Sequence, residues 1–382
     1  MSQVTNYQCP SCTGPLHYVG SSGKLECDYC GSSFDVAEIE ALYAPKDEAA
    51  AQETAQQPAG EETAEEIDFE ADGVKETEWD TSNFNADWGA EAEEMKAYIC
   101  PSCGAELICD ASTAATSCPY CGNPTVVPGQ FAGALKPDFV IPFKLNKDDA
   151  INALKEHYKG KPLLPKAFTK ENHINEIKGV YVPFWLFDGE AEGGARYETT
   201  RTRVYRLGDE EITETRHYDV YRAGRVRFEK IPVDASSKMP DEHMDSIEPY
   251  DYSELVPFST AYLPGFLADK YDVSVDDSRK RADLRCENSL HAALRDTVQG
   301  YDSCVRVSDS SRLRRGKVHY ALMPVWMLNT KWHGKDYLFA MNGQTGKMVG
   351  DLPMSWGKFW GMFAAISVPL GVIGSLISLL MH

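Results

Sequence analysis

Hydrophobic residues in the C-terminal two-thirds of the chain mostly follow the period of β-strands. Residues 196–206 and 213–230 alternate between apolar and polar side chains, which predicts two strands of an antiparallel sheet with one exposed face. Apolar runs at residues 180–187, 320–328 and 337–341 predict further strands. Together these segments predict antiparallel meanders.

Two stretches of the same region show the helical period instead. Asn146 is a predicted N-cap, with Asp149 three residues later, and a helical face follows it. The apolar positions on that face are Ile151, Leu154 and Tyr158. A second helix is predicted over about residues 276–298, with Leu290, Ala293, Leu294 and Val298 on one side. Helices and antiparallel strands over residues 131–355 predict a domain of the α+β class.

The segments Tyr181–Leu186 and Leu322–Met327 resemble each other in sequence. Each follows a predicted helix, and each opens a predicted meander. We therefore expect an internal duplication within residues 131–355.

An apolar run close to the C-terminus, residues 359–381, contains no charged side chain. At a rise of 1.5 Å per residue, a helix of this length would extend about 34 Å, and the hydrocarbon core of a bilayer is about 30 Å thick. Trp356, Lys358 and Trp360 would lie at the membrane interface. We expect residues 356–382 to form one transmembrane helix; the alternative is a buried core helix.

Small residues recur every fourth position in this predicted helix, at Ser367, Gly371 and Ser375. Such spacing lets two helices approach closely, so a homo-oligomer or a membrane partner is one expectation. The other is ordinary use of glycine and serine in a membrane helix.

The negative charge of the chain is concentrated in residues 44–96. This segment has three lysines against seventeen acidic residues, and it accounts for −14 of the net charge of −20. Low hydrophobicity and high like charge predict a disordered acidic linker. Trp79, Phe84 and Trp88 interrupt the pattern. These aromatics are either a short segment that docks on a partner or on the protein itself, or incidental residues in a tether.

Eight of the eleven cysteines form two units with the same spacing, Cys-x2-Cys-x14-Cys-x2-Cys. The units are Cys9, Cys12, Cys27 and Cys30, and then Cys100, Cys103, Cys118 and Cys121. A two-residue spacer places both sulfurs of a pair on one tight turn, and four thiolates complete a zinc tetrahedron. We therefore expect two zinc ribbons, over residues 1–43 and 97–130, each with one structural zinc ion.

Other uses of these cysteines stay open. A redox Cys-x-x-Cys pair and a rubredoxin-like iron site are the alternatives to zinc. The polar segment before Cys9 has no apolar core of a signal peptide, and paired cysteines without one favour a reducing compartment. Cys109, Cys286 and Cys304 are expected to be buried or inert thiols.

The ribbons carry few of the basic side chains that nucleic-acid binding requires. Lys24 is the only lysine or arginine of the first ribbon, and residues 97–130 contain neither. This composition argues against nucleic acid and favours protein docking or structural support.

Two further constellations have both a functional and a structural interpretation. Asp188, Glu190 and Glu192 would share one face of a strand, where they could hold a cation or pair with Arg196, Arg201 and Arg203. Residues 343–347 resemble a phosphate loop, but Met341 and Met348 stand where that motif needs glycine and serine or threonine. A turn between strands explains residues 343–347 better than a phosphate loop does.

The chain resembles a family of bacterial membrane proteins described as TFIIB-type zinc ribbon-containing. The resemblance covers most of the chain and rests on the following features: the two Cys-Pro-x-Cys ribbons, the acidic spacer with Trp79 and Trp88, residues 181–187 and 339–347, and the terminal apolar run. It implies a membrane-anchored accessory protein, associated with flotillin-like and phage-shock-like proteins in envelope stress. It implies no known activity.

These observations predict a non-enzymatic, membrane-anchored zinc-ribbon adaptor or scaffold. The helix would anchor it in the cell membrane, its N-terminal domains would be cytoplasmic, and the acidic tether would let the first ribbon search for protein partners. The alternative is a membrane-tethered zinc-ribbon regulator that binds nucleic acid.

Overall fold

The computed structural model describes residues 9–43 and 78–380, apart from short gaps. The gaps are residues 13, 15, 21, 28, 89–91, 93–94, 111–116, 124–125, 130–134, 171–173 and 175. Residues 44–77, most of the expected acidic linker, lie outside the described residues, so the expected disorder is not addressed there.

One eleven-stranded sheet forms the centre of the described chain. Its strands are β4 (Met95–Ile99), β5 (Glu106–Asp110), β6 (Val127–Gly129), β7 (Phe139–Val140), β8 (Lys178–Leu207), β9 (Glu210–Asp234), β10 (Val256–Pro257), β11 (Leu267–Asp269), β12 (Ser303–Trp332), β13 (Lys335–Asn342) and β14 (Met348–Gly350). The main path runs β10-β7-β12-β8-β11-β5-β4-β6, with β9 beside β8 and β13-β14 beside β12.

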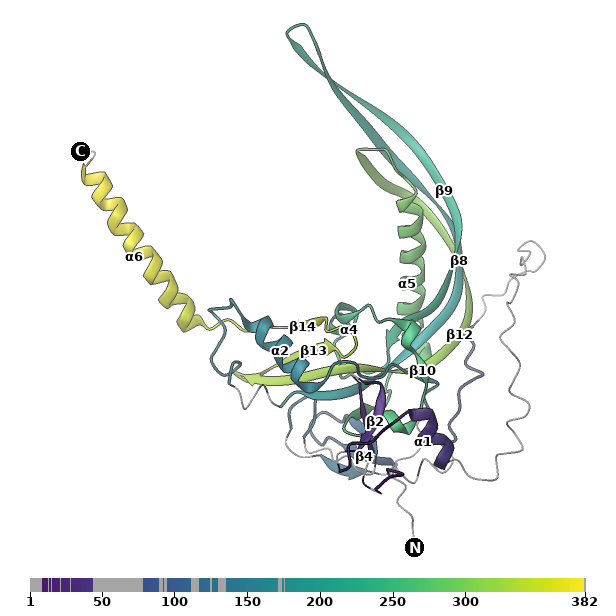
Figure 1. The fold of residues 1–382 in the computed structure, drawn as a ribbon. Helices are drawn as coiled ribbons and strands as arrows, with labels where there is room; N and C mark the ends of the chain where they lie inside the picture. The colour runs from purple at the N-terminus through teal and green to yellow at the C-terminus, as the bar shows by residue number, and fades with distance from the viewer. Residues whose placement is uncertain are drawn as a thin grey trace, which may run out of the picture.

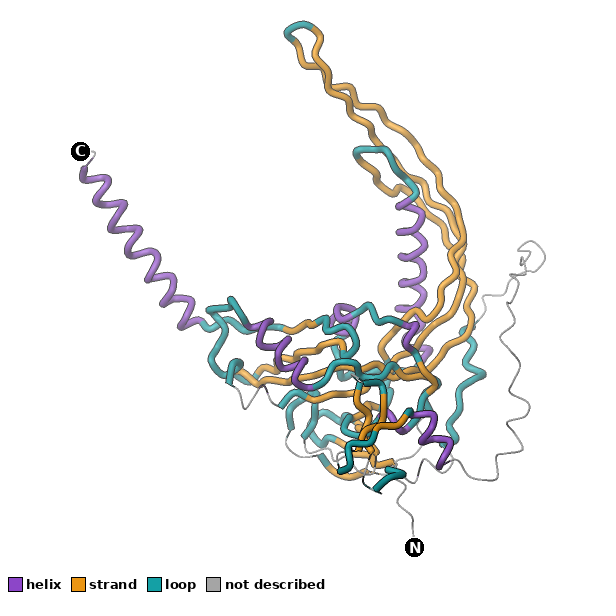
Figure 2. Tube along the Cα trace, viewed as in Figure 1, coloured by secondary structure: helices purple, strands orange, loops and turns teal. Residues whose placement is uncertain are grey.

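A small separate sheet and several helices surround it (Figure 1). The small sheet consists of β1 (Leu16–Val19), β2 (Lys24–Cys27) and β3 (Ser33–Phe34). The helices are α1 (Val36–Tyr43), α2 (Lys147–Tyr158), α4 (Asp241–Ile247), α5 (Val275–Asp296) and α6 (Trp356–Leu380), with short 3-10 turns η4 (Tyr252–Glu254) and η5 (Thr260–Tyr262). Figure 2 shows that strands dominate, and the α+β class is confirmed.

Both predicted helices form, and α2 begins directly after its predicted N-cap, Asn146. Asn146 Oδ1 accepts from the backbone N–H of Asp149 at 2.9 Å, and Asp149 Oδ2 accepts from that of Asn146 at 3.0 Å, so α2 begins with a capping box. In α5 the buried side chains are spaced four apart, at Ala282, Cys286, Leu290 and Leu294. Ala293 is exposed, so its predicted place on the buried side was wrong: the stripe follows the i, i+4 direction.

Three strands extend far beyond the body as a curved arm (Figure 1). We call residues 188–229 and 303–316 the arm. β8 and β9 pair from Phe184↔Asp234 to Leu207↔Glu210, and Gly208, with φ of 66°, lies in the two-residue turn between them. β12 pairs with β8 only as far as Ser303↔Thr200. The hairpin beyond that point is therefore two-stranded.

Helix α5 lies along the inner side of the arm (Figure 1). Its apolar stripe packs on Ala191, Ala195, Tyr197 and Val220. Gly193 lets helix and strands approach, because a Cβ there would lie 2.2 Å from Ser310 O and 3.0 Å from Leu290 Cδ2. The prediction of a sheet with one exposed face is therefore confirmed at the base of the arm, where α5 covers the other face. Residues 201–210 are exposed on both faces because no layer covers them.

The strand pairings repeat in a nearly symmetric way. β7 runs parallel to β12, β11 runs parallel to β8, and β8 and β12 are antiparallel to each other. Each long strand follows a helix, α2 or α5, and is followed by a return strand, β9 or β13. A duplicated unit would give this topology, and the duplication itself stays a hypothesis.

The aromatics of the expected linker pack against the body of the protein. Trp79 is 8% exposed, and its ring lies 4.7 Å from that of Phe187. Asp80 N donates to Gly316 O, and Val318 N donates to Asp80 O, both at 2.9 Å. We call residues 78–88 the strap. The expected linker over residues 44–96 thus includes a packed segment. Burial of its tryptophan rings stabilises this segment by more than its negative charge destabilises it.

The other two aromatics of the strap dock in the same way. Phe84 stacks on Trp185 at 5.3 Å between ring centroids, and Trp88 meets the Phe258 ring edge-on at 5.7 Å. Of the two predicted kinds of docking, the described residues show docking on the protein itself.

We expect Trp79→Ala to lower the free energy of unfolding by ~3 kcal/mol, since it removes a buried indole from a packed site. Chemical denaturation in mild detergent measures this change, and limited proteolysis should show faster cleavage within residues 78–88. Leu284→Ala, at a side chain that is 55% exposed, is the control and should change stability by less than ~0.5 kcal/mol. Equal midpoints for the two variants would contradict the packing role.

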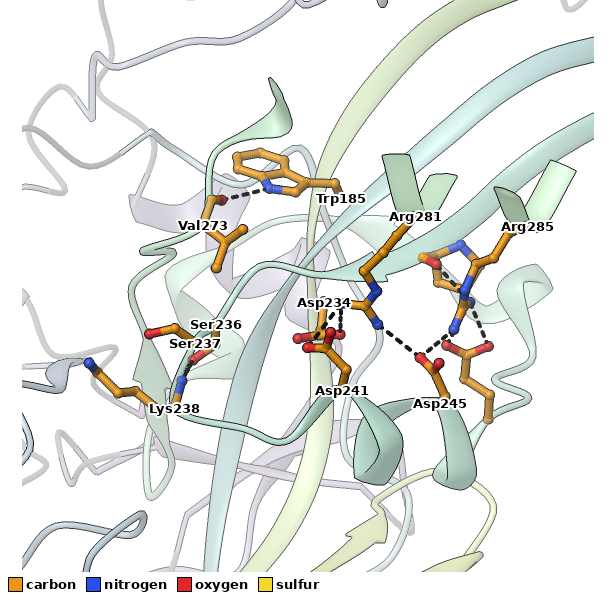
Figure 3. Close-up of polar contacts among 12 residues, drawn as sticks. Trp185, Asp234, Ser236, Ser237, Lys238, Asp241, Asp245, Val273, Arg281 and Arg285 are labelled. Atoms are coloured by element: carbon orange, nitrogen blue, oxygen red, sulfur yellow. Dashed lines mark hydrogen bonds and ion pairs between the residues drawn. The ribbon is translucent and has the colours of Figure 1, made fainter. Parts of the chain in front are cut away.

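An ion-pair network fastens α5 to α4 and to the end of β9 (Figure 3). Arg281 lies 2.9 Å from Asp234, 3.1 Å from Asp241 and 3.0 Å from Asp245. Arg285 pairs with Asp245 and with Glu248, the latter at 3.0 Å. Asp234 is only 2% exposed, and burial raises the pKa of its carboxyl to about 6 even though Arg281 opposes the shift.

The network gives stability a defined pH dependence. Because the folded protein holds the Asp234 proton more tightly than the unfolded chain, this group stabilises the fold at low pH, and its contribution is lost as pH rises from about 4 to 6. Asp234→Asn should reduce that pH-dependent loss of stability by about 3 kcal/mol. Urea unfolding between pH 4 and 7 measures it. Asp241→Asn, at an exposed partner of the same arginine, should change the slope much less, since Asp241 contributes less than burial to the raised pKa of Asp234.

Candidate metal centres

The first four predicted ligands meet at one point of the N-terminal ribbon. Cys9 Sγ and Cys30 Sγ are 3.5 Å apart, and Cys12 Sγ and Cys27 Sγ are 3.4 Å apart. All four sulfurs lie within 4.8 Å of one another. Cys9 and Cys27 are buried, whereas Cys12 and Cys30 face outward.

The second four converge in the same way. The distance between Sγ atoms is 3.6 Å both for Cys100 with Cys121 and for Cys103 with Cys118. This group also fits within 4.8 Å. Cys100 and Cys118 are buried, and the other two are half-buried. The structure therefore brings together all eight predicted ligands, four at each site.

Backbone hydrogen bonds fold each cysteine pair into a knuckle. Gly31, Gly104 and Gly122 each follow the second cysteine of a pair, with φ near 70°. Their N–H groups donate to the carbonyl of the first cysteine at 2.8, 2.9 and 3.1 Å. A positive φ suits glycine at this turn, which explains its recurrence in the sequence.

Zinc fits both sites. A tetrahedron with Zn–S bonds of about 2.3 Å separates its sulfurs by about 3.8 Å, close to the distances found. Four thiolates leave no ligand position open, so each site has the form of a structural centre. The sulfur cage is also compatible with other tetrahedral thiophilic ions; zinc identity stays a prediction.

Neighbouring groups favour thiolates at some positions and oppose them at others. The hydroxyl and N–H of Ser32 lower the pKa of the Cys30 thiol to about 6. Burial opposes ionisation of Cys100, but knuckle N–H groups outweigh it and lower its pKa to about 7. Burial raises the pKa of Cys103 to about 11. Four thiolates at one site therefore require a cation among them.

The second ribbon is part of the main sheet. β4 pairs with β5, and β5 pairs with β11 at Ala268↔Ile108, which joins residues about 160 positions apart. Cys100 and Cys118 belong to the same buried cluster as Val180, Val182 and Met323. The second centre is thus part of the core of the body.

The first ribbon has its own sheet but packs on the body. Tyr18 meets Tyr262 edge-on at 5.0 Å between ring centroids, and Ala261 of η5 is fully buried in the ribbon's core. Gly20 closes the contact, because a Cβ there would lie 1.7 Å from Phe143 O. The expectation that this ribbon moves freely on a tether is therefore not what the described residues show.

One comparison with known proteins identifies a relative. The uncharacterized protein YdjG of Bacillus subtilis (strain 168) is 34% identical over 334 residues, which cover 74% of this chain and 98% of YdjG. The chain belongs to the YdjG family. No family model matches it, and no solved structure matches it significantly.

In this YdjG-family protein, the remaining three cysteines belong to neither group of four sulfurs. Cys109 is buried in β5, and Cys286 is buried on α5, where burial raises the pKa of its thiol to about 12. Cys304 is half-buried in the arm. The predicted burial is confirmed for Cys109 and Cys286, and their inertness stays a prediction.

The three predicted carboxylates do not converge. Asp188 accepts from Lys230 N at 2.7 Å and lies 3.2 Å from His319 Nε2. Glu190 and Glu192 both contact Arg225, at 2.9 and 3.7 Å. The charge-pairing interpretation is therefore the better one, but the arginine comes from β9 and not from β8, because the partner strand brings Arg225 directly opposite Glu192.

The apparent phosphate loop is a turn. Asn342 Oδ1 accepts from the N–H groups of Gln344 and Thr345, both at 2.9 Å, between β13 and β14. Its amide nitrogen donates to Ile247 O at 3.0 Å. This matches the prediction of a turn between strands.

A buried polar cluster beneath the second ribbon was not predicted from the sequence of this YdjG-family protein. Ser236 Oγ donates to Asp269 Oδ2 at 2.6 Å, beside the fully buried ring of Tyr120. Burial raises the pKa of Asp269 to about 7. Tyr29 holds the same place in the first ribbon and is 79% exposed. The Tyr-Cys-Gly sequence is the same in both ribbons, so it does not predict that Tyr120 is buried and Tyr29 exposed. Burial of Tyr120 depends on the part of the body that packs against the second ribbon.

Proposed function

We propose that this protein is a non-enzymatic, membrane-anchored adaptor in which two structural zinc ions stabilise the platform of a protein-binding arm. The observation that carries the proposal is the arm itself. A core does not need strands of 25 to 30 residues, and residues 201–210 are exposed without exception. Exposed apolar side chains along the arm, such as Leu207, Tyr221 and Val305, offer contact surface to a partner.

Helix α6 supports the anchor. Of the described residues, only this helix is long and apolar enough to cross a membrane, and none of its apolar window is buried against the protein. The contacts at its base are Ser355 N to Leu163 O at 2.8 Å and Lys358 Nζ to Leu164 O. An unburied apolar helix argues for lipid around it rather than a protein core. Self-association through Gly371 and Ser375 stays a prediction.

The charge of the arm supports a site of action at the membrane surface rather than within the bilayer. Figure 1 shows α6 and the arm leaving the body on the same side. Exposed Arg201, Arg203 and Arg206 keep the arm out of hydrocarbon, so it would meet partners at the membrane surface. Reduced zinc thiolates favour the cytoplasmic face of the cell membrane. From the resemblance to TFIIB-type zinc ribbon proteins, we propose that the partners are flotillin-like or phage-shock-like proteins.

The alternative, a regulator that binds nucleic acid through its ribbons, receives less support. Lys24 lies 3.4 Å from Asp35, so the cation of the first ribbon is already paired. The second ribbon is built into the sheet and brings no basic side chain of its own to a phosphate.

Shortening the arm tests the proposal. Replacing residues 203–214 with Asn-Gly would close the hairpin on the existing Thr202↔Thr215 pair and keep the contacts of Arg201 with Gly300. Crosslinking in native membranes should lose the partner of the wild-type chain, at least about tenfold in yield, while the zinc content and melting temperature stay unchanged.

A matched control leaves the arm intact. Arg203→Lys keeps length and charge at the tip and should retain the partner. An unchanged crosslinked partner in the shortened chain would contradict binding through residues 203–214 at the tip of the arm, and specific binding to DNA at low salt by the same chain would favour the alternative.

A further inference from the structure

A cavity lies where the first ribbon meets the body. Its volume is about 590 Å³, within the range of about 300–1,000 Å³ common for ligand sites. Tyr18 and Val19 of β1 form one wall, and Phe143, Leu145, Phe266 and Trp326 form the other. The lining is mainly apolar, and it comes from two folding units that only this contact brings together.

The aromatic wall is rigid. The rings of Phe143 and Phe266 stack at 4.1 Å with an angle of 3°, and the Trp326 ring meets Phe143 edge-on at 5.2 Å. Trp326 Nε1 donates to Leu145 O at 3.0 Å, which fixes the indole. These side chains cannot turn inward to fill the space, so the cavity is a stable feature of the fold.

Two lysines, Lys147 and Lys178, are among the residues that line the cavity. Lys178, at the start of β8, is more than half buried and donates to Ser117 O at 2.7 Å. Lys147, at the start of α2, is close enough for its charge to act on Lys178. Among the described residues, no carboxylate lies within ion-pair distance of either group. Burial lowers the pKa of Lys178, whereas the nearby charges of Cys118 and Glu176 oppose that shift.

We propose that this cavity binds an acyl carboxylate, with the chain against Phe143, Phe266 and Trp326 and the carboxylate between Lys147 and Lys178. An apolar wall with two lysines beside it is complementary to an apolar anion, and acyl chains are the apolar anions of a membrane. The choice of acyl chain thus rests on the proposed membrane location. The cavity and its charges do not.

Binding would hold the first ribbon on the body. Because β1 supplies one wall and the body supplies the other, a ligand that contacts both stabilises the docked arrangement over any other. The acyl carboxylate would then set how firmly the first ribbon is held.

Photolabelling of the full chain in nanodiscs of zwitterionic lipid tests the proposal. A palmitate with a diazirine in mid-chain should form adducts that mass spectrometry maps to the segments of Phe143, Leu145 and Phe266. Lys147→Met with Lys178→Met should reduce these adducts by about tenfold, as expected for loss of charge-assisted hydrogen bonds. The corresponding double arginine variant should retain them.

Controls separate the outcomes. Lys155→Met, at an exposed position of α2 away from the cavity, should label as the wild type does, and two zinc ions per chain should remain in every variant. Adducts confined to α6, or equal labelling of the cavity by the methyl ester of the probe, would overturn the proposal. Failure of the anchor would instead prevent incorporation into nanodiscs, so the two failures are distinguishable.

Discussion

Replacing Cys118 with serine should unfold the large domain, whereas Cys27→Ser should leave it folded. Cys118 is 2% exposed within the cluster that holds Val180 and Val182 at the centre of the sheet. Cys27 is also 2% exposed, but its cluster contains only ribbon residues, Ala261 and Tyr262. Equal burial and equal chemistry thus lead to different expected outcomes, because the two centres belong to different cores.

The expected magnitudes support this asymmetry. Structural zinc contributes an apparent 10–16 kcal/mol in isolated zinc-finger peptides, and whole domains are stable by about 5–15 kcal/mol. Loss of one ligand at the second centre can therefore exceed the stability of the domain. Loss at the first centre should release the ribbon from Tyr262 and expose η5 to proteases.

Zinc stoichiometry, thermal unfolding and limited proteolysis measure the difference. Cys304→Ser, outside both centres, should retain two zinc ions and the wild-type melting temperature. A Cys118→Ser variant that melts as the wild type does, or a Cys27→Ser variant that loses the large domain, would refute the division into two cores.

Ending the chain after Ser355 should move the protein from the membrane fraction to the soluble one. The change removes the one helix of the described residues that can span a bilayer, together with the contact of Lys358 with Leu164. The body should remain folded, since none of the α6 side chains that the structure describes, residues 356–375, is buried. Carbonate extraction of cell membranes, followed by detection of the protein in each fraction, measures the effect.

Substitutions within α6 supply a matched pair. Leu370→Arg with Val372→Arg adds two charges, each costing about 2.5–3.5 kcal/mol in the middle of a membrane helix, and should also release the protein. Leu370→Ala with Val372→Ala should not. Retention of the truncated chain in the membrane fraction would mean that another part of the protein binds it.

Features set by local spacing could be predicted from the sequence. Each zinc knuckle needs only six neighbouring residues, and the capping box of α2 needs Asn146 and Asp149. Both follow from backbone geometry that a few residues determine. The apolar period of α5 was correct except at Ala293, where the choice of side depended on the arm that it covers.

Features that depend on pairing between distant segments could not be predicted from the sequence. Nothing in residues 106–110 indicates that β5 joins β11, because the pairing depends on edges that only the folded sheet presents. The strap was ambiguous for the same reason: Trp79 has a partner only once Phe187 and Gly316 are in place. The arm appeared as separate strands, since Gly189, Gly193 and Gly194 interrupt the apolar pattern of β8 without ending the strand.

The breaks in strand register at the base of the arm have a mechanical consequence. β8 and β9 lose register between Phe187 and Gly189, and β12 loses register with β8 between Arg315 and Val318, at the same level. A sheet resists bending through its continuous ladder of hydrogen bonds, so its stiffness is lowest there. A sideways load at the tip acts through a long lever and bends the arm at Asp188. The hydrogen bonds that join Asp80 to Gly316 and Val318 cross this level, so the strap stiffens the base of the arm. Release of the strap would make the arm more flexible there.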